Sequence, residues 1–237
     1  MPPATQRRGP PANKLLAALP RREYQRLLPG LEEIPLLFEK VLYEAGELIF
    51  DVYFPTSGIV SLLAAVGDRA TLEVGLVGRE GMVGVPAFMG VEASRNRAVV
   101  QGAGFALRME ARVFRKECDD GNSLPRLLRR YTHSLLTQIS QSAVCNRFHL
   151  IDARLARWLL MTRDRMCADE FRLTQEFLSN MLGVRREGVN KAAGRLQQQH
   201  LITYSRGTLT ILNPAGLEGV ACQCYEIIRQ EYDSFLH

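Results

Sequence analysis

The sequence predicts an α+β protein with an N-terminal β-roll, a long central helix and a C-terminal winged helix-turn-helix. Three observations support this fold class. Short alternating runs separated by glycines fill residues 34–109, one long helical stripe follows, and residues 173–212 read as two short helices and a hairpin. With 237 residues, 46% of them apolar, the chain is long enough to bury the cores of two modest domains.

Composition narrows the class of protein. The net charge of +5 permits a nucleic-acid partner without demanding one. No apolar run reaches the length of a membrane span, and the N-terminus lacks the apolar core of a secretion signal, so we expect a cytoplasmic location and no membrane partner. Five cysteines, an odd number, fit a reducing compartment.

The first part of the chain is predicted to be a tail followed by the roll. Residues 1–13 are rich in Pro and Arg and should be disordered. A helix is expected from Lys14 to about Leu28, and the roll domain is assigned to residues 14–121. Evenly spaced strands with glycine turns are typical of a β-barrel or roll. The expected strands are Lys40–Tyr43, Leu48–Phe54, Ile59–Ala65, Thr71–Val77, Arg97–Val100 and Phe105–Met109.

A central helix is assigned to residues 122–146. Its apolar stripe is interrupted by small and polar residues, which suits a parallel helix pair between two copies of the chain. The predicted dimer seam consists of Leu128, Tyr131, Leu135, Ile139 and Ser142. The alternative is that this stripe packs only on its own β domain.

The C-terminal domain, residues 147–237, contains the most informative stretch. Thr174 is a good N-cap, and Gly183 stands where a helix end needs a left-handed residue. In the second helix, an inward face of Val189, Ala192, Ala193 and Leu196 opposes a polar face. Two helices, a glycine turn and a polar first turn describe a helix-turn-helix, whose second helix enters the major groove.

A predicted hairpin follows this motif. Arg206-Gly207 lies between two alternating runs, which predicts a wing. From Arg172 to Arg206 there are six Arg or Lys and two Glu, a net of +4, so positive charge gathers where phosphates would lie. The alternative is an ordinary helical hairpin with a solvated charged face.

The predicted DNA contacts follow from side-chain chemistry. Arg186 can donate two hydrogen bonds to guanine, and Glu187 can accept one from cytosine. Gly183 and Gly188 are expected to let the backbone approach the DNA closely. The full predicted set is Thr174, Gln175, Arg185, Arg186, Glu187, Asn190, Lys191 and Arg206.

No metal or catalytic site is predicted. Cys222 and Cys224 are read as two positions on one helix, where they would point to different faces. No nearby Cys or His completes a zinc pattern around them. No Ser/His/Asp, Cys/His or phosphate-loop pattern stands out, and Gly78 to Gly81 reads as a tight turn, so we expect neither an enzyme nor a cofactor.

The order of these parts resembles the CRP/FNR family of bacterial transcription regulators. The resemblance rests on Leu173-Thr174-Gln175-Glu176, Leu182 to Val189, Leu201-Ile202 and Arg206-Gly207, with Tyr43 to Gly46 and Tyr53 to Val60 in the roll. It implies a cyclic-nucleotide-binding-like double-stranded β-helix, a homodimer on palindromic double-stranded DNA, and RNA polymerase as a further partner.

The resemblance also places an effector pocket in the roll. The matching positions are Gly84, Val85, Ser94, Arg95 and Arg97. Val85 replaces the acid that would accept from a ribose hydroxyl, so the pocket is expected to be degenerate and not to bind cAMP. The family's iron–sulfur branch uses N-terminal cysteines, whereas no Cys precedes Cys118 here. An alternative function is a cyclic-nucleotide- or other small-ligand-binding regulatory protein with a role that does not involve DNA.

Overall fold

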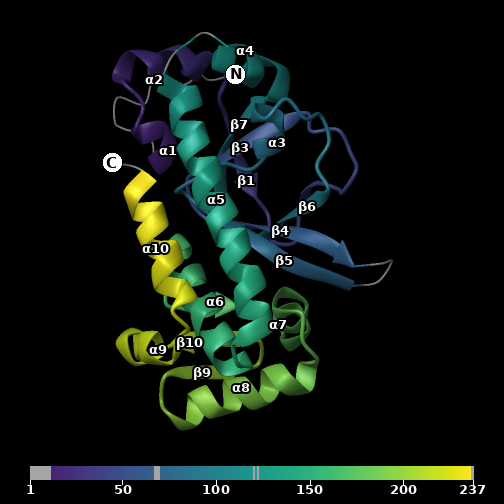
Figure 1. The fold of residues 1–237 in the computed structure, drawn as a ribbon, viewed down its shortest axis with the longest axis vertical. Coiled ribbons are helices and arrows are strands. Elements are labelled where there is room, and N and C mark those ends of the chain that lie inside the picture. Colours follow the sequence, from purple (N-terminus) through teal and green to yellow (C-terminus); the bar gives the residue numbers. More distant parts are fainter. Residues whose placement is uncertain (1–11, 67–69, 120, 122, 236–237) are drawn as a thin grey trace.

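The computed structural model describes residues 12–66, 70–119, 121 and 123–235. A β-roll lies at one end and a helical module at the other, and a single long helix runs beside both (Figure 1). The predicted α+β architecture is confirmed. No helix in these described ranges is both long and apolar enough to cross a membrane.

The N-terminal helix is divided in two. Helix α1 spans Lys14–Ala17 and α2 spans Arg21–Leu27, because Pro20 interrupts the pattern and becomes the N-cap of α2. A 3-10 turn, Leu28–Gly30, follows. The predicted tail lies outside the described residues up to residue 11, but its assigned end is wrong. Asn13 is fully buried, caps α1, and donates to Pro55 O (2.9 Å) and Gly81 O (2.8 Å).

The roll consists of two antiparallel sheets. One has the order β1-β7-β3 and the other β2-β6-β4-β5. All the predicted strands occur with small shifts at their ends, whereas β1 was missed because its Glu-Glu-Ile-Pro-Leu sequence alternates poorly and contains a proline. The strands are β1 Glu32–Leu36, β2 Val41–Tyr43, β3 Asp51–Pro55, β4 Ile59–Val66, β5 Ala70–Val77, β6 Asn96–Gly102 and β7 Gly104–Glu110. Helices α3 (Val85–Phe88) and α4 (Ala111–Asp119) complete this part.

The long helix α5 spans Ser123–Phe148, two residues beyond its predicted end. The predicted dimer seam on it is misplaced. Its residues pack inside their own chain, against the roll and against α10 (Cys224–Phe235), which lies alongside α5 in Figure 1. Leu128, Tyr131, Leu135 and Ser142 are buried and Ile139 is half-buried. The side chains that α5 exposes are different ones.

Helix α6, Ile151–Met166, is the centre of the C-terminal half. It contacts the roll, α8 (Arg186–Gln198), α9 (Pro214–Val220) and α10, so most of its surface is covered. The helical spacing of this segment predicts a wetter side with Arg154, Arg157, Arg163 and Arg165. Three of these arginines, Arg154, Arg157 and Arg165, are buried instead, and only Arg163 is partly exposed. Trp158 and Leu159 form part of the core, as their spacing predicted.

The C-terminal module continues with a strand that the sequence did not reveal. Strand β8 (Glu170–Arg172) pairs with the second strand of the predicted wing, which gives a sheet of order β8-β10-β9. The wing strands are β9 Ile202–Ser205 and β10 Thr208–Ile211. The sequence from Pro214 to about Leu236 predicts one last helix, but the structure divides this segment into α9 (Pro214–Val220) and α10. Pro214 lies in the first turn of α9, where proline is well tolerated.

Candidate nucleic-acid interface

The two helices of the motif are α7, Gln175–Leu182, and α8, Arg186–Gln198. Thr174 caps α7, because its side-chain oxygen accepts from Phe177 N at 3.0 Å. Gly183 ends α7 with φ of 60°, a left-handed conformation that glycine adopts without a Cβ penalty. Both local predictions are confirmed, and together they fix the angle between the helices.

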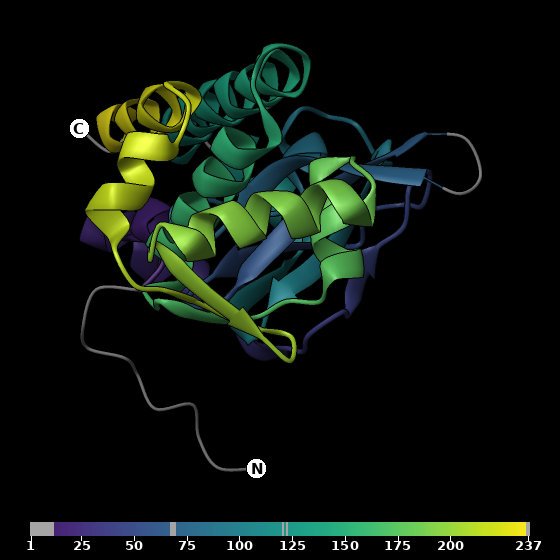
Figure 2. The same cartoon turned by 90° about the horizontal axis from the view of Figure 1, so that it is seen from below.

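Helix α8 lies at the lower end of the molecule in Figure 1 and runs across the near face in Figure 2. Its inward residues Val189, Ala192, Ala193 and Leu196 are buried, as predicted. Its first turn carries the polar side chains outward. All eight predicted DNA contacts are exposed: Thr174, Gln175, Arg185, Arg186, Glu187, Asn190, Lys191 and Arg206.

The wing is fixed beside this helix. Arg206 and Gly207 both have positive φ, 51° and 79°, which makes the tight turn between β9 and β10. Tyr204 fastens the hairpin to the motif by donating its hydroxyl to Leu173 O at 2.8 Å. A hollow of about 620 Å³ therefore lies between the wing, the N-terminus of α7 and the first turn of α8. It is lined by Thr174, Gln175, Glu176, Arg186, Tyr204, Arg206 and Gly207.

Two arginines of the module are held by carboxylates that the sequence did not single out. Arg186 forms an ion pair with Glu176 across the hollow, and both side chains are largely exposed. Arg195 donates through Nε and Nη2 to the Asp152 carboxylate of α6. This contact joins α8 to α6 within the domain. The pairing of Arg186 with Glu176 holds the guanidinium at the mouth of the hollow. To contact a base, Arg186 would release the Glu176 carboxylate and bind the base edge in its place.

The two glycines near the motif leave space for neighbouring side chains. A Cβ at Gly183 would lie 2.6 Å from Leu72 Cδ1 of β5, and one at Gly188 would lie 3.0 Å from Ile151 Cδ1 of α6. The lack of a Cβ is therefore explained by packing at both positions, and the expectation that these residues bring the backbone close to DNA stays a prediction.

A sequence profile for the Crp-like helix-turn-helix domain matches residues 153–220. Residues 153–220 are a Crp-like helix-turn-helix domain. This range takes in α7, α8 and the wing, with most of α6 and α9. It is the same segment whose exposed polar face is described above.

Known structures show that about four fifths of the chain shares the fold of CRP/FNR regulators. FixK2 from Bradyrhizobium japonicum is 16% identical with a TM-score of 0.69, covering 81% of this chain and 98% of its own. The c-di-GMP-responsive global regulator CLP from Xanthomonas campestris is 17% identical with a TM-score of 0.66, covering 81% and 99%. A CRP-family regulator from Thermus thermophilus is 20% identical with a TM-score of 0.65, covering 79% and 96%. No curated protein sequence matches the chain.

Two of the predicted effector positions, Gly84 and Ser94, contact Tyr43. The buried Tyr43 hydroxyl meets the Ser94 side chain and the Gly84 backbone, and burial raises its pKa to about 12. Val85 is buried in α3. Arg97 pairs with Glu44 at 3.0 Å, and Arg95 is exposed. A protein hydroxyl therefore fills the space between Gly84 and Ser94.

A buried polar network joins the roll to the Crp-like domain. Glu73 of β5 accepts from Trp158 Nε1 of α6 at 2.8 Å and from Ser61 Oγ at 2.7 Å. Burial raises the pKa of Glu73 to about 7, although these hydrogen bonds and the nearby guanidiniums of Arg157 and Arg165 favour its ionised form. No sequence motif indicates this network, because Glu73 and Trp158 are 85 residues apart in the sequence.

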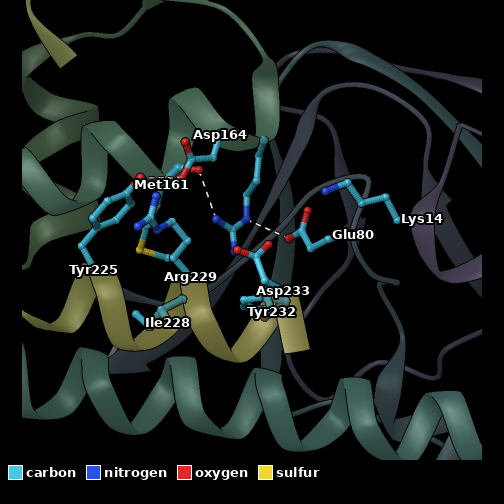
Figure 3. Close-up of a pocket in the computed structure, with 10 residues that line it drawn as sticks. Lys14, Glu80, Met161, Asp164, Tyr225, Ile228, Arg229, Tyr232 and Asp233 are labelled. Atoms are coloured by element: carbon cyan, nitrogen blue, oxygen red, sulfur yellow. Dashed lines mark hydrogen bonds and ion pairs between the residues drawn. The ribbon is translucent and has the colours of Figure 1, made fainter. Parts of the chain in front are cut away.

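A second junction surrounds Arg165, close to the N-terminal helices. Its guanidinium pairs with Glu80 at 2.8 Å and donates to Gln138 Oε1 of α5 at 2.9 Å. The guanidinium also lies over the Tyr232 ring of α10. Figure 3 shows this small pocket, with Glu80 on the roll side and Tyr225 and Tyr232 coming from α10. The turn predicted for Gly78 to Gly81 is confirmed by the Gly81 N–Gly78 O hydrogen bond of 3.2 Å.

Proposed function

We propose that this protein is a homodimeric, sequence-specific DNA-binding transcription regulator of the CRP/FNR type, with a roll that does not bind cAMP. The observation that carries the proposal is the exposed polar first turn of α8 beside the wing, within a Crp-like helix-turn-helix domain. Residues 14–121, 122–146 and 147–237 serve as effector-like roll, central helix and DNA-binding domain. RNA polymerase is the further partner that a regulator of this type implies.

In the proposed complex, the first turn of α8 lies in the major groove. Arg186 donates to O6 and N7 of guanine, and Glu187 accepts from a cytosine amino group. Arg206 on the wing contacts the phosphate backbone, while Asn190 and Lys191, one turn further along α8, contact bases or phosphates. The hollow of about 620 Å³ between the wing and the helix leaves open space beside Arg186 and Arg206, which both line it.

Selection of bound duplexes from a random pool tests this function. The expected product is a palindrome with half-sites about one helical turn apart, each with a G·C pair at the position of Arg186. Enrichment of no duplex at low salt would favour the alternative of a small-ligand-binding protein that does not act on DNA.

The dimer is proposed to form through the exposed face of α5, which lies opposite the predicted seam. Leu136 is 55% exposed, and Val144 and Phe148 are exposed further along the helix. Ser140 and Ala143 lie near the same stripe and are also exposed, so two copies of α5 can approach closely there. Large exposed apolar side chains at helical spacing on one helix face are typical of an interface.

Replacing Leu136 by Glu should convert the dimer to a monomer, because it places an unpaired charge in a desolvated contact. Sedimentation velocity measures the change, and circular dichroism checks that the chain remains folded. Leu37→Glu is the matched control, since Leu37 is an equally exposed leucine in the roll. A Leu136→Glu protein that sediments as a dimer would rule out this face.

The roll is proposed to have lost cyclic-nucleotide binding. Val85 offers no acceptor to a ribose, Arg97 is engaged by Glu44, and the Tyr43 hydroxyl lies between Gly84 and Ser94. Millimolar cAMP or cGMP should therefore leave the melting temperature unchanged, because only a ligand that binds the native state raises it. A saturable rise with either nucleotide would contradict this reading of the roll.

A further inference from the structure

Four potential metal ligands meet where the DNA-binding module joins the rest of the chain. Cys145 lies in the last turn of α5 and His149 directly follows that helix, whereas Cys222 precedes α10 and Cys224 is its first residue. Their ligand atoms all lie within 4.8 Å of one another. The Cys145 and Cys222 sulfur atoms are 3.4 Å apart, and Cys224 Sγ lies 3.6 Å from His149 Nδ1.

The local backbone explains why the four converge. His149 N donates to Cys145 O at 3.1 Å, which continues the last helical turn by one residue, so the two side chains lie on the same side of it. Cys222 precedes α10 and is not part of a helix, whereas Cys224 begins it. Because a turn separates them, the two side chains do not have to point to different faces of one helix. The sequence argument against a metal assumed that both residues lie on one helix, and that assumption is wrong.

The spacing matches one tetrahedral ion. Zinc–sulfur bonds of about 2.3 Å and zinc–nitrogen bonds of about 2.0–2.1 Å imply ligand–ligand edges of about 3.6–3.8 Å. The two close pairs, at 3.4 and 3.6 Å, are near these edges. An iron–sulfur cluster distributes its ligands over several iron atoms and needs a wider set. Three thiolates and one imidazole in a tetrahedron favour zinc.

Burial and charge support the same assignment. Cys145 is fully buried and Cys224 nearly so, which is typical of a closed structural site. Two buried guanidiniums, those of Arg154 and Arg157, are close enough to act on the Cys145 thiol group. Within the described residues the Nε atoms of both arginines have no hydrogen-bond partner. A zinc ion with three thiolates and a neutral imidazole carries a net charge of −1, which would offset this buried positive charge.

We propose that Cys145, His149, Cys222 and Cys224 bind one zinc ion that clamps the base of the DNA-binding module. Cys145 and Cys222 are 77 residues apart in the sequence. That interval contains α6, the helix-turn-helix and the wing. The ion therefore holds the entry and exit of the module together and anchors the start of α10 against α5. Binding releases the protons of three thiols, so zinc affinity falls as the pH is lowered.

Elemental analysis of the purified full-length protein tests the stoichiometry. We expect about one zinc per chain, as for a structural site with four protein ligands. Cys224→Ser and His149→Gln should each lose most of the zinc. Cys167→Ser is the matched control, because Cys167 is exposed and lies outside the cluster, and it should keep the zinc.

Cobalt substitution gives a readout that does not depend on stability. Co²⁺ in the full chain should show thiolate-to-metal charge transfer and the intense visible bands of tetrahedral coordination. Cys224→Ser should weaken these bands, and Cys167→Ser should not. Chelation should lower the melting temperature of the wild type and of Cys167→Ser, but not that of a variant already without metal.

Several results would overturn the proposal. One is wild-type protein that contains no zinc and shows no thiolate–cobalt bands after reconstitution under reducing conditions. Another is zinc content in Cys224→Ser and His149→Gln equal to that of the control. A third is a disulfide between Cys145 and Cys222 in protein kept under reducing conditions. In the structure these sulfur atoms are 3.4 Å apart, well beyond the bonded distance of about 2.05 Å. If Cys224→Ser fails to fold, His149→Gln alone decides, because His149 is only half-buried.

Discussion

Replacing Arg165 by Met should destabilise the fold by about 3–5 kcal/mol, the range expected when one partner of a buried ion pair is removed. Arg165 is 7% exposed and pairs with Glu80, which is also buried. Its loss leaves the Glu80 carboxylate without its cation and Gln138 Oε1 without its donor. Urea unfolding measures the change as a lower midpoint at constant slope.

Arg163→Met is the matched control for this experiment. Arg163 belongs to the same helix and pairs with Asp169, but both side chains are substantially exposed. Its loss should cost less than about 1 kcal/mol. Adding Glu80→Gln to Arg165→Met should restore part of the stability. Equal effects of the two Arg→Met variants would show that Arg165 does not join the roll to the Crp-like domain.

Gly81→Ala should destabilise the fold by about 3 kcal/mol, the upper part of the range for overpacking. An added Cβ would lie 2.1 Å from Tyr131 Cε2. Tyr131 cannot move aside easily, because it is fully buried and donates to Met82 O at 3.0 Å. Thermal unfolding measures the effect.

Gly194→Ala should have the opposite effect on stability. Gly194 lies inside α8, and nothing stands within 4 Å of an added Cβ. The variant should be stabilised by about 0.5–1 kcal/mol, because alanine favours helix over glycine. If Gly81→Ala is as stable as Gly194→Ala, the close contact between the turn at Gly81 and α5 does not exist in solution.

The sequence predicted those parts of the fold that depend on local patterns. The strands of the roll follow from alternation and glycine turns, and the helix-turn-helix follows from Thr174, Gly183 and the inward residues of α8. Each of these signals is contained within a few residues of the element that it defines. Such elements were therefore identified with only small errors at their ends.

Which face of α5 is buried could not be predicted in the same way. The helix has a broad stripe, and the choice depends on α10, which returns from the far end of the chain and covers Tyr131 with Tyr232 and Phe235. Leu136, next to the assigned seam, is on the exposed side instead. The buried arginines of α6 were misplaced for a related reason, since their carboxylate and carbonyl partners come from other elements.

The cysteine cluster shows the same limit. Cys222 and Cys224 were treated as helical neighbours without a third ligand, because the sequence does not reveal the interruption before α10. Cys145 and His149 lie more than 70 residues earlier, and their spacing by four residues is common in helices. Only the folded chain brings the two pairs together.

Binding of wild type, Arg186→Ala and Arg206→Ala to the selected duplex and to scrambled DNA across a salt series tests the central claim most directly. We expect Arg186→Ala to lose about 1–3 kcal/mol on the selected site, with relaxed preference at one base pair and little change on scrambled DNA. Arg206→Ala should weaken binding to both duplexes and reduce the salt slope by about 1. Equal loss on both duplexes for Arg186→Ala, or no loss for either variant, would contradict the assignment of α8 as the helix that reads DNA.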